Sequence, residues 1–530
     1  MFFGLALTLA FYAGGGEGAS LACETRNQEN NALFWESQAL ATVMERVKNK
    51  QNTNTAKNVI LFLGDGMSIP TLTASRIHLG QISGHSGEEA QLSFEKFPFT
   101  GLAKTYCVDG QVADSACTAT AFLCGIKANV ATIGVTADVN HRDCEAGRNA
   151  TNHVKSIVHL SQMAGKRTGI VTTTTVTHAT PAGAYAHTPS RDWQSDANVV
   201  DDGENPEHCV DIASQLIHGD TGKNLNVIFG GGRKNFIPNN IRDDEGMFGS
   251  RLDGRDLISE WKAAGAGREY VYNVSGLKAI RDDTHFALGL FHSDHMDFNF
   301  DRNPTQQPSL AEMTRRAIDI LSRSESGFFL FVEGGRIDHA HHLNLARKAL
   351  DETLEFHKAV EIADEMTDER ETLIVVTSDH AHTMSFGGYP ERGSDILGIA
   401  GYGSDNLPYT TLTYASGAGK KTDPHGNRID ITRHNFSDPN YEYPSYIPLS
   451  AETHGGDDVA IFARGPWAHL LSGVIEQNVI PHVIKFASCV GEDNDTCAVA
   501  FGGVTHLGAP LSLIFLLVVP LLYTGCQMFW

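Results

Sequence analysis

Residues 327–342 read GFFLFVEGGRIDHAHH, an unbroken apolar run that passes through two glycines into one Asp and three His. Five more apolar runs end in a polar or glycine cluster. They are NVILFLGDG (58–66), GIVTTTTVTHATPAG (169–183), LNVIFGGG (225–232), TLIVVTSDH (372–380) and DVAIFARG (458–465). Because these runs are continuous rather than alternating, they are typical of strands buried on both faces of a parallel sheet.

Amphipathic helical patterns lie between these runs, for example at 308–324 and 345–366. Alternating strands and helices predict an α/β fold, with a doubly wound, mostly parallel central sheet flanked by helices. Such a sheet places functional groups just past the carboxyl ends of its strands. The polar residues at the predicted strand ends are Asp65, His178, Glu333, Asp379 and His380.

The charge balance limits the possible ligands. The 530 residues include 63 Asp and Glu against 41 Lys and Arg, a formal net charge of -22. A nucleic acid would be repelled by this charge, so a nucleic-acid-binding role is not expected. A small anionic substrate would need local cations, from arginine or from metal ions.

Both ends of the chain resemble targeting signals. Residues 1–22 have a short apolar stretch followed by small residues, which indicates a secretory signal rather than a disordered or anchored N-terminus. The apolar tail within 498–530 follows small residues and a polar spacer, as in a glycosylphosphatidylinositol (GPI) attachment signal; a transmembrane helix is the alternative.

Secretion predicts disulfides and glycans. The glycosylation sequons begin at Asn149, Asn273, Asn435 and Asn494. The chain has nine cysteines, of which Cys489 and Cys497 flank a short acidic loop and are plausible partners. Spacing alone leaves the remaining pairings open.

The opening segment contains candidate zinc ligands. Asp338 and His342 are four residues apart, so one turn of helix directs both toward one ion. Catalytic zinc sites use three protein ligands, and His454 in ETHGGDD (452–458) is a candidate for the third. The alternative is that the histidines are solvated or only hydrogen-bonded.

A second candidate set favours the metal interpretation. Asp379 and His380 leave another strand end, and Asp65 ends a third. Two zinc ions about 4 Å apart are a known arrangement for in-line phosphoryl displacement. Glu333, Asp65 and the Thr180 hydroxyl would form an all-oxygen site, which suits magnesium, although Thr180 alone is also compatible with an ordinary turn.

The candidate nucleophile is Ser115 in VADSACTATAFLCG (112–125), where a helix N-terminus would favour an anion. The sequence has no Gly-x-Ser-x-Gly elbow, so a serine activated by metal is the open possibility. Arg191 in HTPSRDW (187–193) could hold two phosphate oxygens at once, although a single arginine is by default a surface residue.

The motifs LGDGM, DSACTATA, THATPAGAYAHTPSRDW, FVEGGRIDHAHH, SDHAH and ETHGGDDVAIFARGP together resemble the animal type of alkaline phosphatase, in that family's order from about residue 58 to 470. The resemblance implies a first zinc on Asp338, His342 and His454 and a second zinc on Asp65, Asp379 and His380. It implies magnesium on Asp65, Thr180 and Glu333, and a phosphate clamp at Arg191.

The resemblance also implies further features. His178 and His339 match histidines that lie near the magnesium without binding it, and Cys144 would pair with Cys209 and Cys489 with Cys497. The positions of a vertebrate calcium site appear here as His292 and Gln307, so calcium is left open. Cys107 and Cys117 are outside the vertebrate pattern and would either pair with each other or remain thiols. Segment 31–50 resembles an arm helix that embraces a partner subunit, which implies a homodimer.

The expected organisation follows from these observations. The segments are a signal peptide (1–22), an arm helix (23–57), a phosphatase core (58–385), a crown-like insertion (386–450), the end of the core (451–497) and a removed GPI signal (498–530).

The hypothesis for function is hydrolysis of phosphate monoesters at alkaline pH through a phosphoserine on Ser115. Two alternatives are a phosphodiesterase or sulfatase with the same fold, and a GPI-anchored binding protein without activity.

Overall fold

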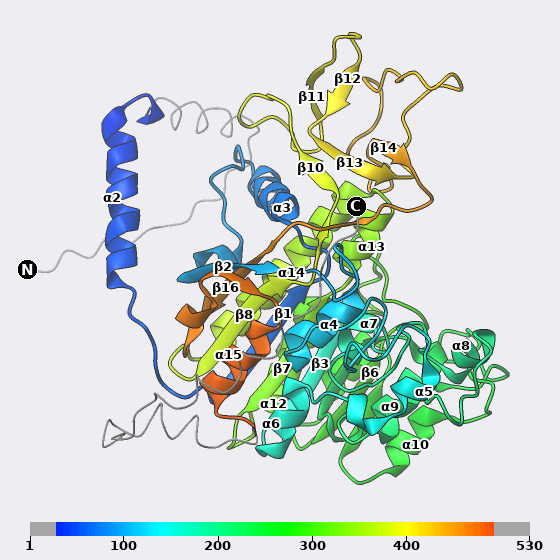
Figure 1. Cartoon of the computed structure of the whole chain (residues 1–530). Coiled ribbons are helices and arrows are strands. Elements are labelled where there is room, and N and C mark those ends of the chain that lie inside the picture. Colours follow the sequence, from blue (N-terminus) through cyan, green and yellow to red (C-terminus); the bar gives the residue numbers. More distant parts are fainter. Residues whose placement is uncertain (1–27, 492–530) are drawn as a thin grey trace, which may run out of the picture. The chain divides into compact units, whose positions relative to one another are not determined.

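One ten-stranded sheet forms the centre of the computed structural model, which describes residues 28–491 (Figure 1). The strand order is β17-β2-β16-β8-β1-β7-β3-β4-β6-β5. The strands are β1 (Asn58–Gly64), β2 (Phe99–Lys104), β3 (Arg167–Thr175), β4 (Val227–Gly231), β5 (Arg268–Val271), β6 (Phe286–Leu290), β7 (Phe328–Gly334), β8 (Thr372–Ser378), β16 (Val459–Arg464) and β17 (Gly473–Glu476). The expected signal peptide and GPI signal, together with Asn494 and Cys497, lie outside the described residues.

The seven adjacent strands from β8 to β5 are parallel. The prediction of a mostly parallel α/β sheet is therefore confirmed. Strand β16 is the exception, because it runs antiparallel to both β8 and β2. The chain enters β16 from the edge where the parallel strands end, directly after a two-residue bridge to β9, and an antiparallel neighbour needs no crossover helix. The run 458–465 is thus a strand, but its expected parallel direction was wrong.

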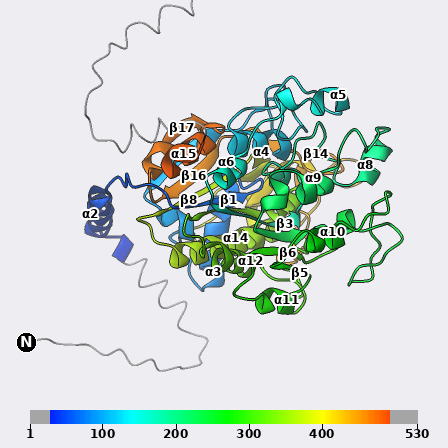
Figure 2. The ribbon, with the colours of Figure 1, turned by 90° about the horizontal axis from the view of Figure 1, so that it is seen from below.

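Helices cover both faces of the sheet, which explains the continuous apolar runs. On β1, Val59, Leu61 and Leu63 belong to one apolar cluster, and Ile60 and Phe62 belong to the cluster on the opposite face. Figure 2 shows α3, α12 and α14 on one side of the sheet and α4, α6, α9 and α15 on the other. Every residue of β7 and β8 is buried. A strand covered on both sides cannot alternate with polar residues.

The helices range in length from one turn of 4 residues to 21 residues. Their bounds are α2 (Ala32–Lys48), α3 (Ile69–Ile82), α4 (Ser115–Cys124), α5 (Cys144–Gly147), α6 (Ile157–Met163), α7 (Ala179–Ala182), α8 (Asp196–Asp201), α9 (Ile212–His218), α10 (Leu257–Ala263), α11 (Val274–Ala279), α12 (Leu310–Leu321), α13 (Arg336–His342), α14 (Ala346–Met366) and α15 (Val479–Ser488). Helix α12 begins with a reciprocal capping box between Ser309 and Glu312, as its sequence Ser-x-x-Glu favours.

The segment expected as an insertion contains small sheets only. Strands β10, β13 and β14 form one of them, and β11 and β12 form another. Their bounds are β10 (Met384–Phe386), β11 (Ile399–Tyr402), β12 (Pro408–Thr410), β13 (Leu412–Gly417) and β14 (Ser445–Pro448). On either side of this segment, β9 (Ala381–His382) pairs with β15 (His454–Gly455), which places residue 382 opposite residue 454. This pairing joins the two ends of the core that the insertion separates in sequence.

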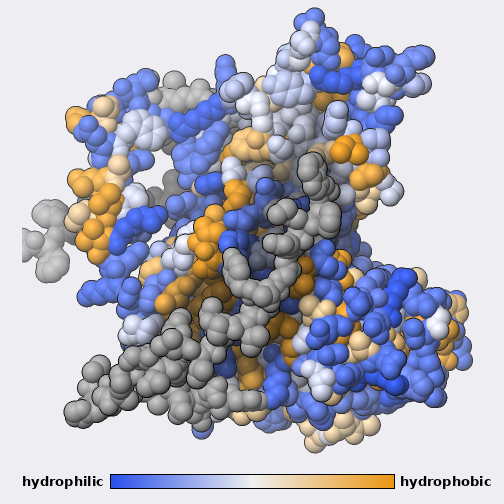
Figure 3. Space-filling view, in the orientation of Figure 1, coloured by the Kyte–Doolittle hydropathy of each residue, from blue (hydrophilic) through white to orange (hydrophobic). Residues whose placement is uncertain are grey.

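Helix α2 buries none of its residues. Six large apolar side chains on it are exposed: Leu33, Trp35, Leu40, Val43, Met44 and Val47. Figure 3 shows apolar surface on this helix facing solvent. Among residues 28–491, no helix is both long and apolar enough to cross a membrane.

Disulfides join two pairs of the described cysteines. Cys144 pairs with Cys209, as the resemblance implies, and Cys107 pairs with Cys117, which resolves the open alternative for these two residues. Cys124 is a free thiol.

The sequon asparagines in the described part of the chain differ in their surroundings. Asn149 and Asn435 are exposed, whereas Asn273 is half-buried, and its side chain caps α11. Glycosylation at these sites stays a prediction.

Candidate metal centre and active site

The carboxyl edge of the sheet gathers acidic side chains from three adjacent strands. In the β1–β7 pairing Leu63 lies opposite Glu333, and in the β1–β8 pairing Gly64 lies opposite Ser378. Asp65 and Asp379 are the next residues of β1 and β8, so they leave the sheet side by side. The polar residues that follow these strands were expected to lie together at the carboxyl edge. The strand register places them there, because neighbouring parallel strands end together.

Two groups of side chains that could hold a metal ion lie at this edge. In the first, Asp338 Oδ1 lies 3.3 Å from Nε2 of both His342 and His454. In the second, His380 Nε2 lies 3.2 Å from Asp379 Oδ2 and 3.6 Å from Asp65 Oδ1. The rings of His380 and His454 stack at 3.6 Å between centroids, so the two groups adjoin. These are the six residues predicted as zinc ligands.

Each of the three candidate ligand histidines is oriented in the same way. The Nδ1–H group donates to a backbone carbonyl: from His342 to Glu452 at 2.6 Å, from His454 to Ala113 at 2.8 Å and from His380 to Ala381 at 3.3 Å. That bond fixes the tautomer and leaves the Nε2 lone pair directed at the carboxylates. Free Nε2 lone pairs are what a metal ion requires.

His382 is a third histidine in the first group, and the sequence motifs gave it no role. Its Nε2 hydrogen-bonds to Asp338 at 2.7 Å, and its Nδ1 bonds to Glu452. Burial alone would lower the pKa of His382, but the Glu452 and Asp338 carboxylates outweigh it and raise this pKa to about 10. Carboxylates thus engage both ring nitrogens of His382, and the residue orients Asp338. The quoted motif SDHAH contained His382, but spacing does not reveal this contact.

The donor set fits metal ions because its buried carboxylates lack partners. Asp65 Oδ1, Glu333 Oε1 and Asp379 Oδ2 are buried, and none has a hydrogen-bond partner among the described residues. Burial, and then repulsion from Asp379, Asp338 and Glu333, raise the pKa of Asp65 well above its ordinary value. Unpaired buried charge is costly, and bound cations would offset this cost.

An all-oxygen site adjoins the second group. Glu333 accepts hydrogen bonds on Oε2 from the hydroxyls of Thr172 and, at 3.2 Å, Thr174, which leaves Oε1 available. Burial raises the pKa of Glu333 to about 7. The Thr180 hydroxyl donates to Asp65 Oδ2 at 3.5 Å. Oxygen ligands without nitrogen or sulfur suit magnesium.

Ser115 is the first residue of α4 and is 1% exposed. Its Oγ lies 3.3 Å from Nε2 of His380, so the hydroxyl faces the second metal group. Small residues follow it in α4, and Gly183 packs closely against Ala119 there. The start of this helix therefore presents the hydroxyl at the carboxyl edge of the sheet.

Asp114 is a further site residue that the sequence reasoning used only as a neighbour of Ser115. It caps α4 through Cys117 N–H and accepts a hydrogen bond from Arg191 Nη1 at 2.8 Å. Burial alone would raise the pKa of Asp114, but Arg191 and backbone N–H groups outweigh it and hold this pKa below its ordinary value. Arg191 Nη2 also lies 3.4 Å from His178 Nε2, and its side chain is 21% exposed, so Arg191 is not an ordinary surface arginine.

His178 and His339 lie together with His295, which no sequence motif indicated. Ring centroids in this group are 4.5 to 5.5 Å apart. Nδ1 of His295 accepts the N–H of Thr175, and Nδ1 of His339 accepts from Arg336. Both donors can only donate, so His295 and His339 carry their protons on Nε2. Protonated nitrogens do not bind a metal, so His295 and His339 are arranged for hydrogen bonding rather than for metal binding.

His341, which had no assigned partner, is fully buried. Its nitrogens bond to the hydroxyls of Thr71 at 3.0 Å and Tyr414 at 2.9 Å. Gln307, at an expected calcium position, hydrogen-bonds to Asp297 instead.

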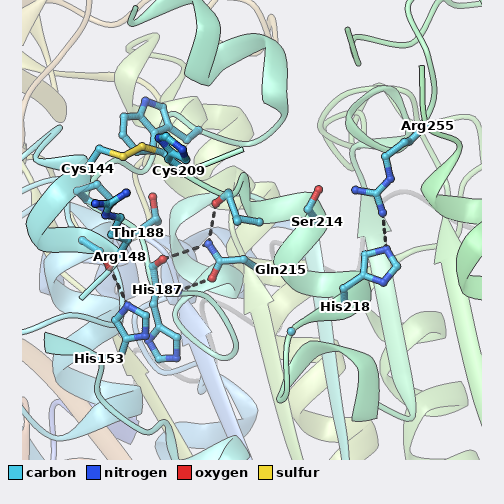
Figure 4. Close-up of a pocket in the computed structure, with 16 residues that line it drawn as sticks. Cys144, Arg148, His153, His187, Thr188, Cys209, Ser214, Gln215, His218 and Arg255 are labelled. Carbon is cyan, nitrogen blue, oxygen red and sulfur yellow. Dashed lines mark hydrogen bonds between the residues drawn. A yellow bond between two sulfur atoms is a disulfide. The ribbon is translucent and has the colours of Figure 1, made fainter. Parts of the chain in front are cut away.

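A separate pocket of about 520 Å³ lies beside the Cys144–Cys209 disulfide (Figure 4). His153 and His187 stack on its wall, and none of the metal-binding side chains lines it. This pocket is therefore separate from the candidate metal ligands at the carboxyl edge.

Comparison with known proteins places the chain in one family. A family model described as alkaline phosphatase matches residues 56–490. The chain is 46% identical to the membrane-bound alkaline phosphatase of Bombyx mori over 494 residues, covering 91% of this chain and 90% of the relative. It is also 46% identical to the tissue-nonspecific isozyme of alkaline phosphatase from Mus musculus over 488 residues, covering 90% of this chain and 92% of the relative.

A solved structure agrees at the level of the fold. The crystal structure of Thermus thermophilus alkaline phosphatase matches with a TM-score of 0.59 at 22% identity, covering 86% of this chain and 97% of that one. The family match and the two relatives together decide the assignment: this chain belongs to the alkaline phosphatase family.

Proposed function

We propose that this protein hydrolyses phosphate monoesters at alkaline pH, through a covalent phosphoserine on Ser115. The observation that supports this most directly is the position of the Ser115 hydroxyl, 3.3 Å from His380 Nε2 and beside buried, unpartnered carboxylates. The relatives named as alkaline phosphatases support the same reaction.

The site residues hold metal ions in this proposal. Asp338, His342 and His454 hold one zinc; Asp65, Asp379 and His380 hold a second zinc; and Asp65, Thr180 and Glu333 hold magnesium. When bound, these ions neutralise phosphoryl oxygens and lower the pKa of a water molecule toward neutrality.

The remaining steps belong to the chain itself. Arg191 binds two phosphoryl oxygens through its planar guanidinium, and Asp114 keeps that group in place. The N-terminus of α4 directs backbone N–H groups at the anion. Ser115 Oγ loses its proton and bonds to phosphorus, while the bond to the ester oxygen breaks and the alcohol leaves with a proton. Water then attacks the phosphoserine, which releases inorganic phosphate and restores the hydroxyl.

The charges of the site favour a monoester over the alternatives. A monoester dianion carries one more negative charge than a diester or a sulfate ester. Arg191 and the proposed metal ions would neutralise that additional charge. A binding protein without activity would not need a complete donor set. All eight predicted metal ligands lie together at one edge of the sheet, which favours an enzyme.

The proposed location is the extracellular face of the cell membrane, through a GPI anchor. Disulfides between described cysteines support an oxidising compartment. Two of the sequons expose their asparagine, which glycosylation requires. The relative from Bombyx mori is named membrane-bound.

A homodimer is proposed from the exposed apolar residues of α2. Leu40 and Val43 are 62% and 54% exposed on a helix that buries no residue. A second copy of the chain that packs on this helix would remove that apolar area from water.

Ser115→Ala is expected to abolish formation of the phosphoenzyme and to lower kcat by at least roughly 10³-fold, because the nucleophile is lost. Zinc and magnesium content measured by mass spectrometry should stay as in wild type, since Ser115 is not among the proposed ligands. A phosphoenzyme trapped at acidic pH from the Ser115→Ala variant would contradict the assignment.

Purified, metal-loaded wild type is expected to turn over an aryl phosphate monoester faster than the matching diester or aryl sulfate. Chelation should remove the activity, and zinc with magnesium should restore it. A preference for the diester or sulfate would replace the proposed reaction, and inactivity of the loaded protein would favour the binding-protein alternative.

Glu333 should make the metal-free protein less stable as pH rises. Its pKa is raised from 4.5 to about 7, so within that window the folded state keeps a proton that the unfolded chain releases. Stability from this group is therefore present at low pH and is lost toward pH 7.

At pH 8 we accordingly expect metal-free Glu333→Gln to exceed metal-free wild type by about 3 kcal/mol in free energy of unfolding. The difference should shrink near pH 5 and reverse after metal loading. Urea unfolding at both pH values measures this, and a metal-free wild type that is the more stable protein at pH 8 would refute it.

Replacing Leu40 and Val43 by Asp should weaken the dimer, with the dissociation constant from analytical ultracentrifugation raised at least about 100-fold. A matched control replaces Gln38 and Thr42 by Asp, which adds the same charge on the opposite side of α2 and should leave the dimer intact. Equal effects of both pairs, or no effect of either, would count against α2 as the contact.

A further inference from the structure

The loop 105–114, between β2 and α4, contacts three parts of the active site. The carbonyl of Ala113 accepts the Nδ1–H of His454 at 2.8 Å, which orients that ring. Asp114 binds Arg191 and caps α4, the helix that begins with Ser115. One loop thus positions a proposed zinc ligand, the phosphate clamp and the nucleophile.

Apolar packing holds this loop only weakly. Its buried apolar contacts form a cluster of four small side chains, separate from the two large cores: Cys107, Ala113, Cys117 and Ala128. Tyr106, Val108 and Val112 on the same loop are exposed. An open groove of about 650 Å³ runs along residues 104–112 and the segment just after His454. Packing of this kind leaves a loop free to shift.

Covalent and polar anchors replace the missing packing. The Cys107–Cys117 disulfide joins the loop to the first turn of α4, and both cysteines are buried. Asp109 Oδ1 accepts the N–H of Val130 at 2.8 Å, and Val108 N–H donates to Ala128. A cross-link restricts the conformations of such a loop much more than one surface hydrogen bond does.

We infer that Cys107–Cys117 is a positioning disulfide for the active site. It holds the loop so that the Ala113 carbonyl stays on His454 and the Asp114 carboxylate stays on Arg191. Without it, the protein loses zinc and phosphate affinity at temperatures where it remains folded. This inference rests on the proposed function, since His454, Arg191 and Ser115 act together in that reaction.

The test is the double variant Cys107→Ala with Cys117→Ala. We expect zinc transfer to a chromogenic chelator to become about tenfold faster, as for other groups that orient metal ligands, and the inhibition constant of inorganic phosphate to rise about tenfold. Both are measured at 25 °C in protein whose circular dichroism equals that of wild type.

The chain offers a matched control in its other described disulfide. Replacing Cys144 and Cys209 by Ala removes the cross-link shown in Figure 4, and neither cysteine belongs to the loop 105–114 or to the proposed ligands. We expect this variant to have a lower Tm and unchanged zinc release and phosphate inhibition. Equal shifts in both double variants would overturn the inference, because they would indicate a general loss of stability.

A second pair of variants tests the loop without changing a cysteine. Asp109→Ala removes one polar anchor of the loop, the hydrogen bond from Val130 N–H, and should shift both readouts in the same direction. Gln111→Ala in the same loop should leave both readouts unchanged. Unchanged readouts in Asp109→Ala and in the Cys107/Cys117 variant overturn the inference; if the cysteine variant does not fold, Asp109→Ala alone decides. Failure of the proposed function is distinguished by wild type itself, which would then lack phosphatase activity.

Discussion

Four carboxylates, those of Asp65, Glu333, Asp338 and Asp379, are buried within one edge of the sheet, each at most 4% exposed. Burial and repulsion from neighbouring carboxylates oppose the ionisation of Asp65 and Asp379, and three of the four keep an oxygen without a partner among the described residues. Without metal the fold relieves this charge by keeping protons, as at Glu333, whereas bound cations would let the carboxylates ionise. Three other features are consistent with a site for cations and an anion. They are the tautomers of the surrounding histidines, the helix N-terminus at Ser115 and the guanidinium of Arg191.

The direction of the strands in the sheet brings these carboxylates together. Adjacent parallel strands end at one edge, so β1, β7 and β8 bring together Asp65, Glu333 and Asp379, which are far apart in sequence. The reversed direction of β16 is equally necessary, because it brings the residues before that strand, including His454, to the same edge. A parallel β16 would have placed its preceding residues at the opposite edge. The antiparallel strand β16, next to β8, therefore brings the last candidate ligand, His454, to the site.

Several residues matter because they orient others. His382 is held between two carboxylates and directs Asp338, whereas Asp114 holds both the helix start and Arg191. His295 and His339 are oriented in the opposite way to the candidate ligand histidines. Their Nδ1 atoms accept hydrogen bonds, so their Nε2 atoms carry protons and offer no lone pair to a metal. The type of residue is thus insufficient to identify a ligand, and the hydrogen bond on the other ring nitrogen decides. Because the whole chain has a formal net charge of -22, these local arrangements are the main source of attraction for an anionic substrate.

The α/β class, the strands that end at the site and the eight candidate ligands could all be predicted from the sequence. Two-sided burial demands continuous apolar runs, and metal donors belong to few residue types. The motifs also indicated the family. Only the tertiary structure decided the direction of β16, the Cys107–Cys117 pairing, and the roles of His295, His382, Glu452 and Asp114. Those features depend on strand pairing and on contacts between residues distant in sequence, such as the 70 positions between His382 and Glu452. Local sequence patterns do not predict such contacts, because the contacts form only when separate elements pack together.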